Sequence, residues 1–186
     1  MICSISAFSQ SASASTYYVA KDGSENFSTI QAALNAAPTG EIIIVKSGTY
    51  NEQISFPRQG VTLKAMSGET VTITQTGRVM SIDQPDLVVE GFVFDGNWGA
   101  SDAVVISSRA NNLILRNIEV KNSARDCIDM VAPSNALIEN SKIHDCIWFS
   151  GTTRNDAHGI VTLGVKDLTV RNTEIYYISG DALQFQ

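Results

Sequence analysis

The stretch LILRNIEV, which begins at Leu113, occurs in three further versions along the chain. These are LVVEGFVF from Leu87, ALIENSKI from Ala136 and LTVRNTEI from Leu168. The central residues of the four stretches, Gly91, Asn117, Asn140 and Asn172, follow one another at spacings of 26, 23 and 32 residues. Repeats of this length indicate a stacked architecture, and the alternation of apolar and polar residues is typical of strands. An Asn that recurs at one turn position predicts side-chain amides that bond from coil to coil, so we predict a parallel β-solenoid.

The composition indicates one folded domain, because 44% of the 186 residues are hydrophobic. The formal net charge of −6 argues against a nucleic-acid-binding protein, since no basic stripe is present to meet phosphates. No apolar run reaches the roughly 18 residues of a membrane span. We therefore expect neither nucleic acid nor membrane as a partner, and we expect a monomer.

The chain begins with a segment of the kind that directs secretion. Residues 1–14 are rich in Ser and Ala and end in Ala12-Ser13-Ala14, an A-x-A cleavage pattern, although MICSISAF contains no basic residue. We interpret this segment as a clipped or degenerate signal and residues 15–186 as the β-solenoid domain, and we predict an extracellular or periplasmic protein. Cys127 and Cys146 lie in one coil, where a disulfide and two buried free thiols are both open alternatives.

A helix is predicted before the strand series. Residues 17–19 indicate a lead-in strand, and Ser28-Thr29-Ile30-Gln31 has the pattern of a capping box that opens a short helix ending before Pro38. Such a helix covers the open end of a solenoid, where strand edges and core residues are otherwise exposed. The chain ends inside the strand-like stretch ALQFQ, so we expect a longer natural protein with further C-terminal coils.

The segment FSTIQAALNAAPTGEIIIVKSGTYNEQISF, from Phe27, closely resembles the first coil of the pectin lyase-like right-handed parallel β-helix superfamily. With the repeats, the resemblance covers residues 17–186. It implies an all-β fold with three strands per coil and a secreted, carbohydrate-active protein. We predict that residues 103–107, 127–131, 159–163 and 182–186 form one parallel sheet, the first sheet of each coil.

Two columns of charged residues are explained by structure alone. Stacked coils place equivalent side chains about 4.8 Å apart. One column contains Glu90, Arg116, Glu139 and Arg171, and the other contains Val93, Glu119, Lys142 and Glu174. Because the signs alternate in both columns, each charge lies between opposite neighbours. We therefore exclude these basic residues from the catalytic candidates.

A third column, at the turn that enters the first sheet, is not balanced in this way. It contains Asp102, Asp126, His158 and Asp181, with Asp129 one step further along its coil and Asp156 just before the histidine. Arg125 is the only cation that we expect beside these acids. Stacked carboxylates repel one another unless a cation or a shared proton intervenes, so the column indicates metal binding or acid–base chemistry. The alternative is that these aspartates only form turns.

Two loops beside the first sheet carry candidate substrate-binding residues. Trp98 lies in DGNWGASD, and Trp148 lies in CIWFSGTTRND, the insertion behind the 32-residue spacing. Aromatic faces bind the C–H faces of sugars, and Arg125 and Arg154 suit a carboxylate. The alternative is that the aromatic side chains only cover the flank of the solenoid.

The resemblance favours a calcium-assisted polysaccharide lyase that acts on an acidic, pectin- or alginate-like polymer by β-elimination. Ca²⁺ takes six to eight oxygen ligands and acidifies the carbon next to a uronate carboxylate. The predicted calcium ligands are Asp102, Asp126, Asp129 and Asp181. The predicted catalytic residues are Asp126, Asp156, His158 and Asp181. The base is not assigned, since Lys166 lies on a turn and further candidates are expected beyond Gln186.

Other members of the superfamily give alternatives. RDCIDM at 125–130 and AHGIVTLG at 157–164 resemble polygalacturonase-like hydrolases, although Leu183-Gln184-Phe185 replaces their Arg-Ile-Lys. Asp156-Ala157-His158 resembles the Asp-x-His of uronate C5-epimerases, with Thr153 in place of their upstream tyrosine. Pectin methylesterase is the least expected activity, because its paired Gln and Asp-Phe-Ile-Phe-Gly segments are absent. A carbohydrate-binding β-helix without catalysis is the remaining alternative.

Overall fold

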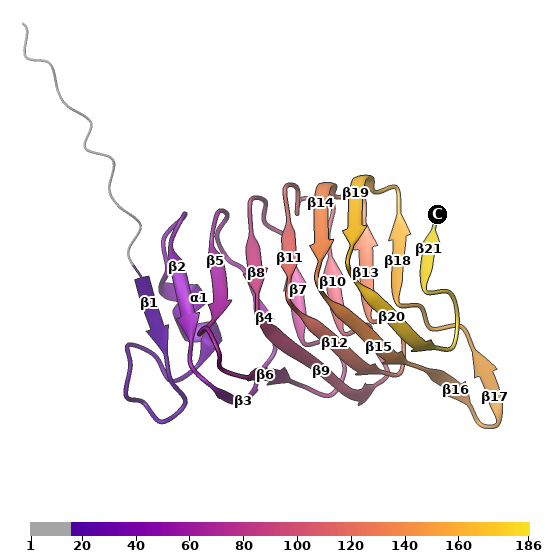
Figure 1. The fold of residues 1–186 in the computed structure, drawn as a ribbon, viewed down its shortest axis with the longest axis horizontal. Coiled ribbons are helices and arrows are strands. Elements are labelled where there is room, and N and C mark those ends of the chain that lie inside the picture. The colour runs from indigo at the N-terminus through magenta and orange to yellow at the C-terminus, as the bar shows by residue number, and fades with distance from the viewer. Residues whose placement is uncertain (1–15) are drawn as a thin grey trace, which may run out of the picture.

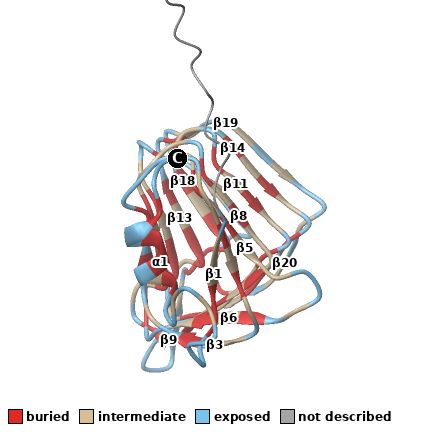
Figure 2. Ribbon diagram, turned by 90° about the vertical axis from the view of Figure 1, so that its left-hand side faces the viewer, coloured by how far each residue is buried: buried red, intermediate tan, exposed pale blue. Residues whose placement is uncertain are grey.

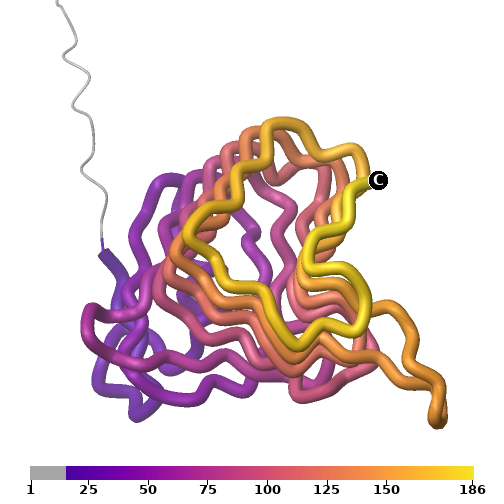
Figure 3. Tube along the Cα trace, turned by 45° about the vertical axis from the view of Figure 1, so that its right-hand side comes forward, coloured from indigo at the N-terminus to yellow at the C-terminus, as the bar shows by residue number. Residues whose placement is uncertain are grey.

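The structure, a computed structural model, describes residues 16–186, so the signal-like segment 1–14 lies outside the described residues. The chain winds into a solenoid whose coils stack along one axis from the N-terminal to the C-terminal end (Figures 1 and 3). Three parallel sheets form its sides. Over residues 16–186, no helix is long and apolar enough to cross a membrane. The predicted parallel β-solenoid is therefore confirmed.

Each sheet takes one strand from successive coils, and each is named here by its first and last strands in chain order. The β1–β19 sheet contains β1 (Thr16–Val19), β2 (Ile42–Val45), β5 (Thr62–Ala65), β8 (Val88–Glu90), β11 (Ile114–Arg116), β14 (Ser134–Glu139) and β19 (Lys166–Arg171). The β3–β20 sheet contains β3 (Gly48–Asn51), β6 (Val71–Thr74), β9 (Phe92–Gly99), β12 (Glu119–Ser123), β15 (Lys142–Cys146) and β20 (Glu174–Ile178). The β4–β21 sheet contains β4 (Ile54–Ser55), β7 (Met80–Ile82), β10 (Val104–Ile106), β13 (Ile128–Val131), β18 (Ile160–Leu163) and β21 (Leu183–Phe185). The β4–β21 sheet is the one that we predicted as the first sheet of each coil. It begins two coils earlier than expected, because β4 and β7 also belong to it.

The interior is filled by equivalent apolar residues from successive coils. Val104, Ile128 and Ile160 are aligned with one another in the β4–β21 sheet and are fully buried. Phe92 and Phe94 lie on the inward face of β9, and both side chains are buried. Each coil therefore packs mainly against the coils above and below it, and buried residues follow the inner side of every sheet (Figure 2).

The turn between the first two strands of each repeat requires a left-handed backbone. The central residues of the four repeats have φ values of 88°, 53°, 52° and 50° at Gly91, Asn117, Asn140 and Asn172. Asn adopts this conformation more readily than other non-glycine residues. The predicted amide stacking is present where Asn172 Nδ2 donates to Asn140 Oδ1 at 3.3 Å. An amide ladder that we did not predict stands at the opposite end of the β1–β19 sheet, in Asp86, Asn112 and Asn135.

Helix α1 (Ile30–Ala36) lies against the N-terminal coils, with Ile30 and Leu34 buried. Its N-cap is Thr29, whose hydroxyl accepts the Ala32 N–H, so the cap lies one residue later than the capping box predicted. The Glu52 carboxylate accepts the first N–H groups of the helix, at 2.9 Å each. A carboxylate from the next coil therefore binds the N-terminus of the helix, whereas the Gln31 side chain bonds the backbone of Ser55.

The first charged column forms two of its expected ion pairs, Glu90–Arg116 and Glu139–Arg171, and the second column does not form its expected pair. Glu90 lies 3.3 Å from Lys64 Nζ and 3.1 Å from Arg116 Nε, and Arg171 lies 2.6 Å from Glu139. In the second column, Glu119 and Lys142 are in register, but Glu119 pairs at 2.6 Å with Lys121 of its own strand. The expected ladder is wrong there, because Lys121 projects from the same face two residues further on.

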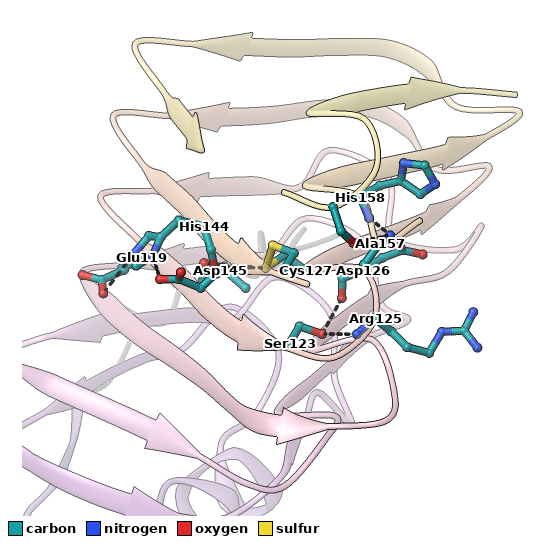
Figure 4. Close-up of a disulfide and its surroundings, with 12 residues drawn as sticks. Glu119, Ser123, Arg125, Asp126, Cys127, His144, Asp145, Ala157 and His158 are labelled. Carbon is teal, nitrogen blue, oxygen red and sulfur yellow. Dashed lines mark hydrogen bonds and ion pairs between the residues drawn. A yellow bond between two sulfur atoms is a disulfide. The ribbon is translucent and has the colours of Figure 1, made fainter. Parts of the chain in front are cut away.

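Cys127 and Cys146 form a disulfide across the buried interior, joining the residue before β13 to the end of β15 (Figure 4). The two cysteines are separated by 19 residues. Of the two alternatives left open by the sequence, a disulfide or two free thiols, the structure contains the disulfide.

Candidate functional site

The predicted acid–histidine column is brought together at the entrance to the β4–β21 sheet. The register pairs Val104 with Ile128 and Ile128 with Ile160. Two residues earlier in each coil stand Asp102, Asp126 and His158, on consecutive coils. Figure 4 shows Asp126 and His158. Because parallel pairing places equivalent residues side by side, the column follows directly from the repeat.

Asp126 is the most firmly held carboxylate of the column. Its Oδ1 accepts the backbone N–H of His158 at 2.6 Å. The buried Ser123 hydroxyl bonds the Asp126 carbonyl at 3.0 Å and accepts the Arg125 N–H at 3.2 Å. Burial raises the pKa of the Asp126 carboxyl above its ordinary value, and the hydrogen bond from His158 offsets part of that increase. Asp126 is therefore fixed in position and retains a proton to higher pH than a free carboxyl group.

Asp129 projects from the outward face of β13, one step along the coil from Asp126. Burial raises its pKa, and the negative charges of Asp102 and Asp126 raise it further. The positive charges of Arg78 and Arg125 act in the opposite direction. A half-buried carboxyl group with a raised pKa, beside a second one, is an arrangement that suits proton transfer.

His158 has a structural hydrogen bond that the sequence did not indicate. Its side chain is 10% exposed, and its Nδ1 accepts the Asp181 N–H at 2.9 Å. Nδ1 is therefore the unprotonated nitrogen of this imidazole, and it is not free to act as a base. The Asp181 carboxylate is 67% exposed, with Oδ2 4.0 Å from Nδ1. Asp156 is exposed on the chain before His158.

A substitution series tests this role of His158. His158→Ala leaves the Asp181 N–H without its partner, and we expect it to lower the free energy of unfolding by about 1–3 kcal/mol. His158→Asn offers a side-chain oxygen near the place of Nδ1, so we expect it to recover most of that loss. Urea denaturation of the three proteins measures the difference, and equal losses in both variants would contradict the role.

Arg125 and Trp148 form one wall of the site. The Arg125 Nε lies 3.5 Å from Asp102 Oδ1, and its guanidinium carbon lies 5.6 Å from the centre of the Trp148 ring. This is a cation–π geometry with a half-exposed indole. The Ser179 hydroxyl accepts the N–H groups of both Trp148 and Ala157 at 3.1 Å. It therefore fixes the two ends of the insertion that carries this wall.

The other predicted binding residues, Trp98 and Arg154, lie on β9 and on a hairpin. Trp98 is 49% exposed near the end of β9, and its φ of 54° is unusual for a bulky residue. Arg154 belongs to the antiparallel hairpin of β16 (Trp148–Ser150) and β17 (Thr153–Asn155). It donates to the Ile178 carbonyl at 2.8 Å, which ties the hairpin to the solenoid. Lys166 is exposed at the start of β19, beyond the opposite end of β18 from His158.

The acidic residues do not gather into a metal site by themselves. Among residues 16–186, no group of three or more His, Cys, Asp or Glu side chains lies close enough to hold a metal ion. Asp126 is bonded to a backbone N–H, Asp102 faces Arg125, and Asp181 is largely exposed. These donors do not fit the predicted calcium site without further ligands, and we assign no chemical step to calcium.

Arg78 is a member of the column that the sequence reasoning missed. Met80 pairs with Val104, so Arg78 stands two residues before β7 as Asp102 stands two residues before β10. The expectation that Arg125 is the only cation beside the acids is therefore wrong. The signal was available in the likeness of RVMSI to DAVVI, 24 residues later.

A hollow of about 620 Å³ lies elsewhere, over the β1–β19 sheet, lined by residues that include Tyr18, Lys64, Met66 and Glu90. Lys64 and Glu90 pair with each other there. Because these two charged groups neutralise each other, we take the acid–histidine column, on a different sheet, as the candidate site.

Three parallel sheets in coil-to-coil register define a parallel β-helix. The chain belongs to the family described as the right handed beta helix region, which matches residues 79–186. The predicted right-handed parallel β-helix and its resemblance to the pectin lyase-like superfamily are thus confirmed.

Solved structures and a curated relative agree with this fold. A rhamnogalacturonan lyase is similar at a TM-score of 0.68 and 15% identity, over 92% of this chain and 61% of that chain. The pectin methylesterase from Yersinia enterocolitica is similar at a TM-score of 0.60 and 15% identity, over 73% and 55%. Pectinesterase 5 from Arabidopsis thaliana is 46% identical over 48 residues, which are 24% of this chain and 8% of the relative. At these identities the structural likeness establishes the fold alone.

Proposed function

We propose that this protein acts on an acidic polysaccharide of the pectin type, bound across the β4–β21 sheet. The observation that carries the proposal is the pair Asp126 and Asp129, two carboxyl groups with raised pKa beside a guanidinium and an indole. Indole faces suit sugar rings, and guanidinium groups suit uronate carboxylates. The pectin enzymes among the similar structures support the same class of substrate.

The reaction that we propose first is β-elimination. A base removes the proton from the carbon next to the uronate carboxylate, a carbon–carbon double bond forms, and the glycosidic C–O bond breaks as its oxygen takes up a proton. In this scheme Asp129 makes the first transfer and Asp126 the second, and Arg125, whose charge acts on Asp129, offsets the charge that develops on the carboxylate. Each group is then needed in the opposite protonation state from the other, which a coupled pair of carboxyl groups supplies.

Ester hydrolysis is the second candidate, and the pectinesterase match supports it. The same two carboxyl groups suit this reaction, with one activating water or attacking the ester and the other protonating the departing methoxide, which leaves as methanol. Glycoside hydrolysis and C5-epimerisation use the same acid–base chemistry and are further alternatives.

Export of the protein is part of the proposal. The Cys127–Cys146 disulfide supports it, because such bonds persist mainly in extracellular and periplasmic compartments.

Product analysis distinguishes these reactions. The protein is incubated with polygalacturonate and with methyl-esterified pectin, each with calcium and with a chelator. An unsaturated product absorbing in the ultraviolet identifies elimination, released methanol identifies the esterase, and new reducing ends without absorbance identify the hydrolase. We expect Asp129→Asn to lower turnover by at least ~100-fold, whereas Asp167→Asn, which changes an exposed aspartate of β19 on another sheet, leaves it unchanged. A protein that neither binds nor turns over any acidic polymer would contradict the proposal. Loss of activity in the presence of the chelator would support the calcium prediction.

A further inference from the structure

Arg78 begins the acid–histidine column from the N-terminal side. It stands in the coil before Asp102, so the column runs from a cation through two carboxylates to His158. Such a cation places a positive charge at the same sheet entrance as the candidate catalytic acids.

The backbone before Arg78 is held rigidly by the neighbouring coil. The Gly77 N–H donates to the Gly96 carbonyl at 2.9 Å. A Cβ added to Gly99 would lie 1.9 Å from the Gly77 nitrogen. The backbones of the two coils are therefore in direct contact, with no side chain between them. Gly99, the last residue of β9, directly follows the half-exposed Trp98. The Arg78 side chain therefore starts from a preorganised position beside a candidate sugar-binding surface.

The guanidinium of Arg78 has no anionic partner within the described part of the chain. Its Nε is buried and makes no hydrogen bond among residues 16–186. In the same range, Arg109, Arg116, Arg125 and Arg171 each pair with an acid, and no ion pair includes Arg78. A buried donor without a partner costs free energy, and a guanidinium recovers that cost best by binding an anion.

The strand register relates Arg78 to Asp129. Ser81 pairs with Val105, and Val105 pairs with Asp129, so Arg78 stands three residues before the position that is aligned with Asp129 two coils further on. Two cations, Arg78 and Arg125, therefore stand at the entrance to the sheet that carries Asp129, and only Arg125 of the two pairs with an acid in residues 16–186.

We propose that Arg78 binds the carboxylate of the uronate residue that is placed over Asp129, and that it thereby selects a free acid over its neutral ester. The inference depends on the proposed function, since it names the group that recognises the charge of that substrate. Arg125, which stacks on Trp148 and pairs with Asp102, then acts from the opposite wall as the second cation near that carboxylate.

Calorimetric titration tests this selection with tetragalacturonate and its fully methyl-esterified counterpart. We expect Arg78→Ala to weaken the binding of tetragalacturonate by about 10- to 100-fold and to leave the affinity for the ester within about twofold. Arg78→Lys keeps the charge without the planar fork, so it should recover part of the loss. Arg109→Ala is the matched control, because it removes an exposed, ion-paired arginine beyond the other end of the same sheet.

Each remaining outcome overturns the inference. If wild-type protein binds tetragalacturonate and Arg78→Ala binds it equally well, Arg78 is not the recognition residue and the proposed function stands. If Arg78→Ala weakens both ligands equally, its role is structural. If the wild-type protein binds no acidic oligosaccharide, the proposed function and the inference both fail. Thermal unfolding of each variant identifies a loss of binding that comes only from unfolding.

Discussion

Replacing Cys127 and Cys146 together by alanine is expected to lower the free energy of unfolding by about 3 kcal/mol. The bond closes a loop across 19 residues, and its loss restores the conformational freedom of that loop in the unfolded chain. Both cysteines are fully buried, so the double alanine variant also removes packing contacts from the interior. Chemical denaturation under oxidising and reducing conditions measures the effect.

The reductant provides the control for this prediction. It should shift the unfolding midpoint of the wild-type protein and leave that of the double alanine variant unchanged. A wild-type midpoint that does not respond to the reductant would show that the bond contributes no stability. Because Cys127 directly follows Asp126, we also expect the reduced protein to turn over substrate more slowly before it unfolds.

The fold was predictable because the repeat carries its own register. Asn140 and Asn172 recur where the backbone must be left-handed, and the period-two pattern identifies which side chains face inward. The Glu90–Arg116 pair followed from the same alignment. The Glu119–Lys142 pair failed, since a column gives the position of a Cβ atom, whereas a long side chain chooses among several partners.

The site was predictable only in part for a related reason. Register placed Asp102, Asp126 and His158 together, but it did not reveal that His158 uses Nδ1 to accept a backbone N–H. That bond depends on the path of the next coil at Gly180, which packs against the ring. Arg78 was missed because β7 is short and follows an irregular turn, so its strand was not recognised as part of the first sheet.

The turn before β7 contains Gly77, which Gly99 of the next coil contacts, and a small substitution at this contact should have a large effect. Gly99→Ala is expected to lower the free energy of unfolding by at least about 3 kcal/mol, because its Cβ would lie 1.9 Å from the Gly77 nitrogen. Both partners in that collision are backbone, so no side-chain rotation relieves it. The coils must move apart, which also breaks the hydrogen bond from Gly77 to Gly96 and displaces Arg78.

Gly151→Ala separates this collision from the general effect of replacing a glycine. Gly151 has a φ of 61° and no atom within 4 Å of an added Cβ, so its replacement should cost only the strain of about 1–2 kcal/mol that a left-handed alanine carries. Thermal and urea denaturation of the two variants give the comparison. Equal losses would mean that the coils at Gly77 and Gly99 separate easily. In that case Arg78 is not held in a preorganised position, and any selection of carboxylates would require the site to order when the substrate binds.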